Sequence, residues 1–170
     1  PAVPTPAEWR GIVDLLESTD AVLLVRSHPL GAGDYRVPGA SGRVRAIGSD
    51  LVPDITPALP ALDALVTDYS SLAFDAALVP LPVVYFAPDL EAYRSRRGMY
   101  GRYADVAADG WASTWPEAIE RIASALEDPE PGRRRSFALS ERVHSYRDGR
   151  NTSRVYAAIR SRLPSPEGDT

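Results

Sequence analysis

The stretch Asp63-Ala64-Leu65-Val66-Thr67-Asp68-Tyr69-Ser70-Ser71 contains a short apolar run that ends in polar residues. An apolar run of this length is typical of a parallel strand that is covered on both faces. Thr67 and Asp68 then lie at the carboxyl end of the strand, and Ser70 and Ser71 are placed to open a helix over residues 72–78. A strand that leads through a short turn into a helix is the building unit of α/β folds.

The same alternation continues on both sides of this stretch. Further strands are predicted over residues 21–25, 44–47 and 82–86, and helices over residues 5–18, 114–126, 133–143 and 151–163, with capping boxes at Thr5 and Thr114. We therefore predict an α/β fold, doubly wound, with an open parallel Rossmann-like sheet and helices on both faces. Residues 1–163 are expected to form a single domain and residues 164–170 a flexible tail.

Composition narrows the functional classes. The chain has 170 residues, 44% of them hydrophobic, and no apolar run approaches the ~20 residues of a membrane-spanning helix. A net charge of −4 argues against a nucleic acid partner. The absence of cysteine, with only two histidines, argues against a bound metal. The chain starts at Pro1, which suggests a mature product or a piece of a longer protein.

All of the basic residues are arginine, so any phosphate must be held by arginine, histidine, hydroxyls or backbone amides. Glycine-rich dinucleotide, P-loop, nucleophile-elbow and zinc-protease motifs are absent from the sequence, and no cofactor is expected. The residues thus indicate an anion-binding crevice at the carboxyl ends of the strands.

Two groups of side chains fall at these strand ends. Ser70 and Ser71 offer hydroxyls, free amides and the positive end of a helix dipole to a phosphate, or they are plain helix caps. His28 follows the strand over 21–25 and can protonate or hydrogen-bond a phosphate oxygen. Alternatively His28 is structural, and Arg26 is the side chain expected in a salt bridge.

Arginine-rich segments further along the chain are less specific. Asp148 and Gly149 form a turn before the last helix, with Arg154 on its first turn, which makes either a second anion site or a capped helix with a solvated arginine. Residues 93–103 interleave arginine with tyrosine and are too irregular for a clean helix; they form either a gate or a surface loop. Arg133-Arg134-Arg135 is expected to be a solvated helix face.

Taken together, several motifs resemble the C-terminal domain of the CDP-glycerol glycerophosphotransferases of bacterial teichoic acid synthesis. The resemblance covers residues 20–160 and is carried by the stretch over 63–71, Phe74-Asp75, residues 82–86, residues 89–94, Arg97-Gly98-Met99-Tyr100, Arg26-Ser27-His28-Pro29, and Asp148-Gly149 with Arg154.

The resemblance implies the nucleotide-donor half of a glycosyltransferase-B architecture, a pair of Rossmann-like domains facing across a cleft. It implies that His28 is catalytic at the donor phosphates, and that CDP-glycerol is bound by Arg26, Ile47, Gly48, Ser49, Asp50, Thr67, Asp68, Ser70, Ser71, Asp148, Gly149 and Arg154. The polymer or lipid-linked acceptor would be bound by an N-terminal half. The implied location is cytoplasmic, with peripheral attachment to the inner face of the membrane through the absent half.

Two alternatives stay open. One keeps the fold but uses a UDP- or GDP-sugar as the donor, and the other is a non-catalytic nucleotide-binding or regulatory module. In either enzymatic case the domain by itself is expected to be inactive, because the family's base for the acceptor hydroxyl belongs to the N-terminal half.

Overall fold

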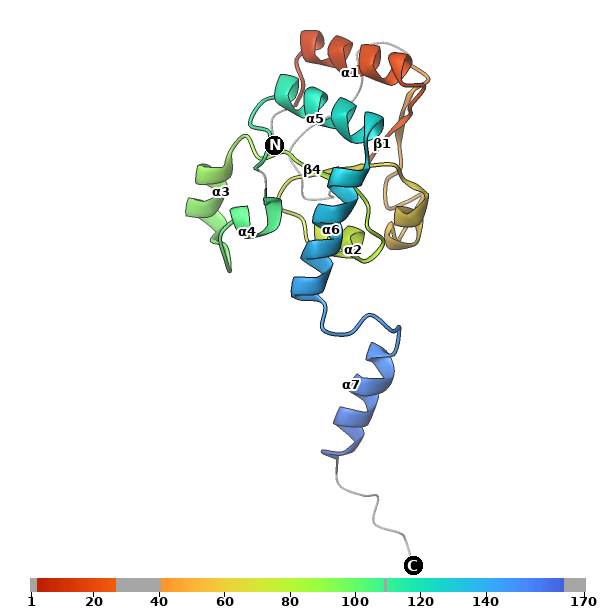
Figure 1. The fold of residues 1–170 in the computed structure, drawn as a ribbon, viewed down its shortest axis with the longest axis vertical. Helices are drawn as coiled ribbons and strands as arrows, with labels where there is room; N and C mark the ends of the chain where they lie inside the picture. Colours follow the sequence, from red (N-terminus) through yellow and green to blue (C-terminus); the bar gives the residue numbers. More distant parts are fainter. Residues whose placement is uncertain (1–2, 27–40, 109, 164–170) are drawn as a thin grey trace, which may run out of the picture.

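The computed structural model describes residues 3–26, 41–108 and 110–163 (Figure 1). Its elements, in chain order, are α1 (Pro6–Ser18), β1 (Leu23–Val25), β2 (Val44–Ala46), the 3-10 helix η1 (Thr56–Ala61), β3 (Leu65–Thr67), α2 (Leu72–Leu78), β4 (Val83–Tyr85), α3 (Leu90–Arg97), α4 (Ala104–Ala107), α5 (Trp115–Glu127), α6 (Glu130–Val143) and α7 (Asn151–Arg160). The mixed α/β class is confirmed.

The described strands form parallel pairs. β1 lies beside β2 with Leu23 opposite Val44, and β3 lies beside β4 with Leu65 opposite Val83. An isolated parallel bridge between Phe86 and Ala112 adds a third segment to the β3–β4 pair. The parallel pairing is thus as predicted. In the described residues, however, the strands are three residues long and form two separate pairs instead of one continuous sheet.

Helices cover both faces of the β3–β4 pair. Leu65 and Val83 pack with η1 and α2 around buried Leu59 and Ala76. Val66 and Phe86 point to the opposite face, where Phe86 and the α5 residue Ala118 are buried. Because side chains alternate along a strand, the near-continuous apolar sequence of β3 and β4 is what allows both faces to be covered.

Helix α5 joins this pair to the other one. Trp9, Ile12 and Leu16 form the buried face of α1, and they pack on β1, β2 and the α5 residue Ile119. Trp115, at the start of α5, packs against this cluster and also against Phe86. The capping box predicted at Thr5 is confirmed. At α5 the Thr114 hydroxyl caps as predicted, while the Glu117 carboxylate accepts from Ser113 N instead of Thr114 N.

The prediction for residues 93–103 was wrong in part. Leu90–Arg97 is a regular helix, α3, and a further short helix, α4, begins at Ala104. Gly98 ends α3 with a φ of +72°, a left-handed conformation that glycine adopts without strain. The glycine therefore marks the end of a helix. Two other boundaries also shift, since α6 begins at Glu130 and α7 ends at Arg160.

Helix α7 stands apart from the rest. Figure 1 shows it beyond the end of α6, away from the strands. None of its residues is buried, whereas α2 buries Ala73, Ala76 and Ala77. We call residues 3–143 the body, as far as the structure describes them, and residues 144–163 the arm.

Candidate functional site

The carboxyl end of β3 is fixed by tyrosine hydroxyls. Tyr103 donates to the carbonyl oxygen of Asp68 over 2.8 Å, and Tyr69 donates to a carboxylate oxygen of Asp89 over 2.8 Å. Asp89 directly precedes α3, so this bond ties the turn after β3 to the segment after β4. The strand ends of β3 and β4 therefore meet at one edge, as predicted for a parallel pair.

Aromatic packing holds the same turn from the side. The ring of Tyr69 stacks on that of Tyr93 with centroids 3.8 Å apart, and the ring centroid of Tyr103 lies 5.5 Å from that of Tyr69. Burial raises the pKa of both the Tyr69 and the Tyr103 hydroxyl, so each stays protonated and acts as a donor at neutral pH. The sequence analysis missed this supporting cluster, although Tyr69 lies within the stretch over residues 63–71.

Ser70 and Ser71 lie exposed at the start of α2. The Ser70 hydroxyl accepts a hydrogen bond from Leu72 N, the first residue of α2, over 3.2 Å. Ser71 is the N-cap residue, but its side chain makes no capping hydrogen bond to the helix. Both residues are open to solvent at the first turn of the helix, and their predicted contact with a phosphate stays a prediction.

Arg26, at the end of β1, holds the segment that follows β2. Its guanidinium donates to the carbonyl oxygens of Ile47, Val52 and Pro53 over 3.0, 2.6 and 3.1 Å. These partners are backbone carbonyls, so the described contacts of Arg26 differ from the salt bridge that was predicted. Arg26 thus supports residues 47–53 in this structure. This role differs from the direct contact with the nucleotide that was predicted for it.

Residues Ile47–Asp50 form a turn at the carboxyl end of the β1–β2 pair. Ile47 N donates to Val25 O over 2.9 Å, and Val52 N donates to Gly48 O over 2.9 Å. Ser49 and Asp50 are exposed on this turn. The turn is therefore placed at a strand end and held by Arg26, and its predicted contact with the nucleotide stays a prediction.

Asp148 and Arg154 pair with each other on the arm. The Arg154 guanidinium donates to both carboxylate oxygens of Asp148, over 2.8 and 2.5 Å, and lies 4.1 Å from the centroid of the Tyr146 ring. Its hydrogen bonds hold the pKa of Asp148 down at about 2. Gly149 has a φ of +71°, which the turn between them requires. The structure brings these residues together but does not bring them to Ser70 and Ser71, because the arm lies away from the strand ends (Figure 1).

The structure describes only one of the two histidines. His28, the predicted catalytic residue, lies outside the described residues, and its role stays a prediction. The Nε2 atom of His144 lies 3.0 Å from the carbonyl oxygen of Phe74, which joins the end of α6 to α2. His144 therefore has a structural contact with the body.

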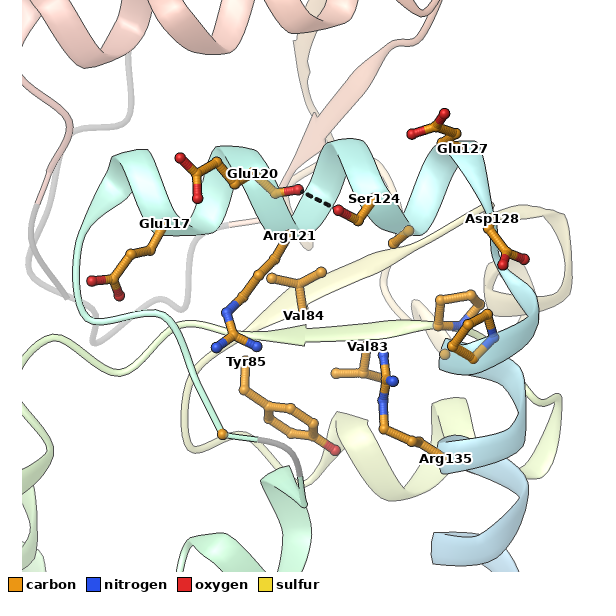
Figure 2. Close-up of a pocket in the computed structure, with 15 residues that line it drawn as sticks. Val83, Val84, Tyr85, Glu117, Glu120, Arg121, Ser124, Glu127, Asp128 and Arg135 are labelled. Atoms are coloured by element: carbon orange, nitrogen blue, oxygen red, sulfur yellow. Dashed lines mark hydrogen bonds between the residues drawn. The ribbon is translucent and has the colours of Figure 1, made fainter.

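A cavity that the sequence did not indicate lies between β4, α5 and α6 (Figure 2). Its volume is about 650 Å³, and Tyr85, Arg121 and Arg135 contribute to its walls. Arg135 is exposed, as predicted for the solvated face of its helix, but it also borders this cavity. No local sequence pattern predicts such a cavity, because it forms where elements that are distant in the sequence pack together.

Among the described residues, no three His, Asp or Glu side chains are grouped as metal ligands would be. Within the same part of the chain, no helix combines the length and the apolar character needed to cross a membrane.

Similarity to known proteins extends over most of the chain. Residues 12–161 match the family model of CDP-glycerol:poly(glycerophosphate) glycerophosphotransferase. A teichoic acid ribitol-phosphate primase of Bacillus spizizenii is 26% identical over 167 residues, which cover 95% of this chain and 40% of the primase. A teichoic acid poly(glycerol phosphate) polymerase of Bacillus subtilis is 33% identical over 102 residues, 59% of this chain and 13% of the polymerase. A teichoic acid ribitol-phosphate polymerase of Staphylococcus aureus is 24% identical over 139 residues, 82% of this chain and 24% of that protein. The chain thus spans well under half the length of these relatives.

Proposed function

Since the chain belongs to the CDP-glycerol:poly(glycerophosphate) glycerophosphotransferase family, we propose that it is the donor-binding domain of an enzyme that builds a teichoic acid or a related cell-wall polymer. The donor is a CDP-activated polyol phosphate such as CDP-glycerol. The domain spans residues 1–163 and corresponds to one Rossmann-like half of a glycosyltransferase-B architecture. The other half binds the polymer or lipid-linked acceptor.

The family match across residues 12–161 carries this proposal. The geometry supports it, because the strand ends of β3 and β4 meet at one edge and the exposed residues Ser70 and Ser71 follow directly. Parallel α/β structures bind ligands beyond the carboxyl ends of their strands. The turn over residues 47–50 occupies the corresponding place after β2.

In the proposed reaction the acceptor hydroxyl attacks the β-phosphorus of the donor. A new phosphodiester bond forms, the bond between that phosphorus and the bridging oxygen breaks, and CMP leaves with the bridging oxygen. The acceptor hydroxyl gives up its proton to a base in the other half. His28 stabilises the transferring phosphoryl group or protonates the leaving CMP.

Other side chains position the diphosphate. Ser70, Ser71 and the amides of the first turn of α2 hold its oxygens, with Thr67 and Asp68 at the strand end beside them. Residues 47–50 lie near the cytidine, with Arg26 supporting them. Arg154 and the Asp148-Gly149 turn close over the donor, which requires the arm to move toward the strand ends.

Isothermal titration tests the proposal with CDP-glycerol, CDP, UDP and GDP. We expect selective binding of the cytidine nucleotides, weakened about tenfold by Ser70→Ala or Ser71→Ala and also by His28→Ala, because each substitution removes a hydrogen bond to a charged group. Ser161→Ala is the matched control, since its exposed hydroxyl bonds within the arm, to Ala158 O.

Each other outcome has a definite meaning. Preference for UDP or GDP points to a sugar transferase. Failure of every nucleotide to bind contradicts the proposed donor site in this domain. Unchanged affinity in the Ser70, Ser71 and His28 variants contradicts the residue assignment while leaving the donor class intact.

A further inference from the structure

One side of helix α7 is apolar and uncovered. Val155, Tyr156 and Ile159 are one and four positions apart, so they share one side of the helix. These side chains, together with that of Leu163 in the turn that ends the helix, are between 55% and 63% exposed. Figure 1 shows α7 beyond the end of α6 and away from the strands. No described part of the chain therefore covers this surface, which we call the apolar face of α7.

The charged residues of the arm are almost all arginine. Residues 144–163 hold five arginines and one carboxylate, that of Asp148, although the whole chain has a net charge of −4. Asp148 is paired with Arg154. Three further arginines are exposed and form no ion pair with any residue that the structure describes, namely Arg150, Arg160 and Arg162. The arm thus carries an excess of positive charge on the same short segment as the apolar face.

These arginines border the apolar face without interrupting it. Arg160 lies about 100° around the helix axis from Ile159, and its guanidinium donates to the Tyr156 hydroxyl over 3.2 Å. Arg162 follows in the turn after the helix. Arg154, in contrast, lies about 140° around the axis from Ile159. Arg154 is therefore on the other side of the helix, and the role proposed for it at the donor does not need the apolar face.

An apolar face bordered by guanidinium groups fits the surface of an anionic lipid bilayer. The interface of such a bilayer offers acyl chains to the apolar side chains and lipid phosphates to the guanidinium groups. A tyrosine on the face is typical of interfacial binding, because its ring is apolar and its hydroxyl is polar. A second copy of α7 would also cover the apolar side chains, but it would bring arginines close to arginines. The charges therefore favour lipid over self-association.

We propose that α7 binds in the plane of an anionic bilayer. Its apolar face enters the interfacial region, and the arginines that border this face contact the lipid phosphates. The resemblance implied a membrane attachment through the other half of the enzyme, whereas this contact belongs to the arm itself. It goes beyond the proposed function, since no step of it involves the nucleotide.

Cosedimentation of the 170-residue chain with lipid vesicles tests this inference. One set of vesicles contains phosphatidylglycerol and phosphatidylcholine in equal parts, and the other contains phosphatidylcholine alone. We expect the chain to bind the anionic vesicles about tenfold or more tightly than the neutral ones, because each arginine near an anionic surface adds to the attraction. High salt should weaken this binding, since it screens exposed charges.

Variants of the arm separate the apolar contribution from the charged one. Ile159→Gln should weaken binding to anionic vesicles about fivefold or more, because an apolar side chain no longer enters the bilayer. Leu78→Gln is its matched control, since Leu78 is an exposed leucine at the end of α2 in the body.

A second pair of variants removes charge. Arg160→Gln combined with Arg162→Gln should weaken binding to anionic vesicles about tenfold or more and leave binding to neutral vesicles unchanged. Arg96→Gln combined with Arg97→Gln is the control, because it removes the same charge from exposed positions of α3. Thermal unfolding of each variant checks that the fold is kept.

The remaining outcomes each overturn the inference. They are equal binding to both kinds of vesicle, unchanged binding in the arm variants, and losses as large in the Leu78 or α3 controls. Absent vesicle binding overturns it too. Size-exclusion chromatography then shows what covers the face: a dimer that Ile159→Gln dissociates means a second copy, and a monomer means the surface of another protein. Titration with CDP keeps the proposed function separate, because Ile159→Gln should leave CDP affinity unchanged.

Discussion

The two segments predicted to hold anions, residues 67–71 before α2 and residues 148–154 at the start of α7, both carry an aspartate and hydroxyl side chains but differ in their surroundings. The first leads into a helix that buries Ala73, Ala76 and Ala77, and tyrosine hydroxyls fix its turn. The second leads into a helix without a buried residue, and its contacts are local. The first segment is therefore held by contacts to distant parts of the chain, and the second only by contacts within the arm.

This difference has a functional consequence. A site that is held by packing keeps its geometry before ligand binds, whereas a site held by a few exposed local contacts can be reorganised at little cost. Under the proposed function, the body would position the donor phosphates and the arm would close over them. Substitutions in the two regions should therefore differ in their effect, most strongly where a buried apolar side chain is lost.

Truncating one apolar side chain in each region should give the largest contrast in stability. Leu59 is 1% exposed and packs with α2, so Leu59→Ala should lower the free energy of unfolding by about 2–5 kcal/mol. Ile159 on α7 is 55% exposed, and Ile159→Ala should change it by less than about 0.5 kcal/mol. Urea unfolding of both variants measures this, and equal losses would show that the arm is packed in solution.

Two helix glycines test how rigid the packing of the body is. A Cβ on Gly132 of α6 would lie 2.7 Å from Cβ of Pro82, a ring atom that cannot swing away. Gly132→Ala should therefore cost about 1–3 kcal/mol, despite the better helix propensity of alanine.

Gly11→Ala in α1 is the matched control. There a Cβ would meet only Cδ1 of Ile119, at 3.3 Å, and this methyl group can move. We expect a neutral or stabilising change of up to about 1 kcal/mol from helix propensity. Thermal unfolding compares the pair, and a stable Gly132→Ala variant would show that α6 can shift away from Pro82.

The smallest effect on stability is expected at the ion pair of the arm. Arg154→Gln should raise the pKa of Asp148 from about 2 toward the ordinary value of 3.8, because the guanidinium hydrogen bonds are lost. A carboxyl whose pKa is lowered by folding stabilises the fold above its ordinary pKa, and that contribution disappears as the pH falls from about 4 to about 2.

An NMR titration of the Asp148 carboxyl in both proteins measures this shift. The variant and the original chain should converge in stability at low pH, where Asp148 is protonated in both. An unchanged pKa in Arg154→Gln would mean that the pair does not persist in solution, and the arm would then lack even its local order.

Local patterns predicted the elements that depend on neighbouring residues. The bounds of α2 and the capping box at Thr5 came from residues within one or two helical turns of each other, and both are confirmed. Residues 93–97 were misjudged, because the glycine-containing segment over 93–103 was interpreted as irregular, whereas Gly98 marks the end of a helix. The exposure of Arg135 follows from its helix face, but its place at a cavity depends on where β4 lies relative to α6.

By itself the sequence determined the alternation of strands and helices, the parallel pairing, and the strand ends at which polar residues gather. These properties follow from hydrogen bonding and apolar periodicity over a few residues. Only the tertiary structure decided that Arg26 supports the turn over residues 47–53 and that Tyr85 and Arg121 border the same cavity. Such contacts join residues that are distant in the chain or lie on elements whose relative placement only packing fixes, and no local pattern encodes that placement.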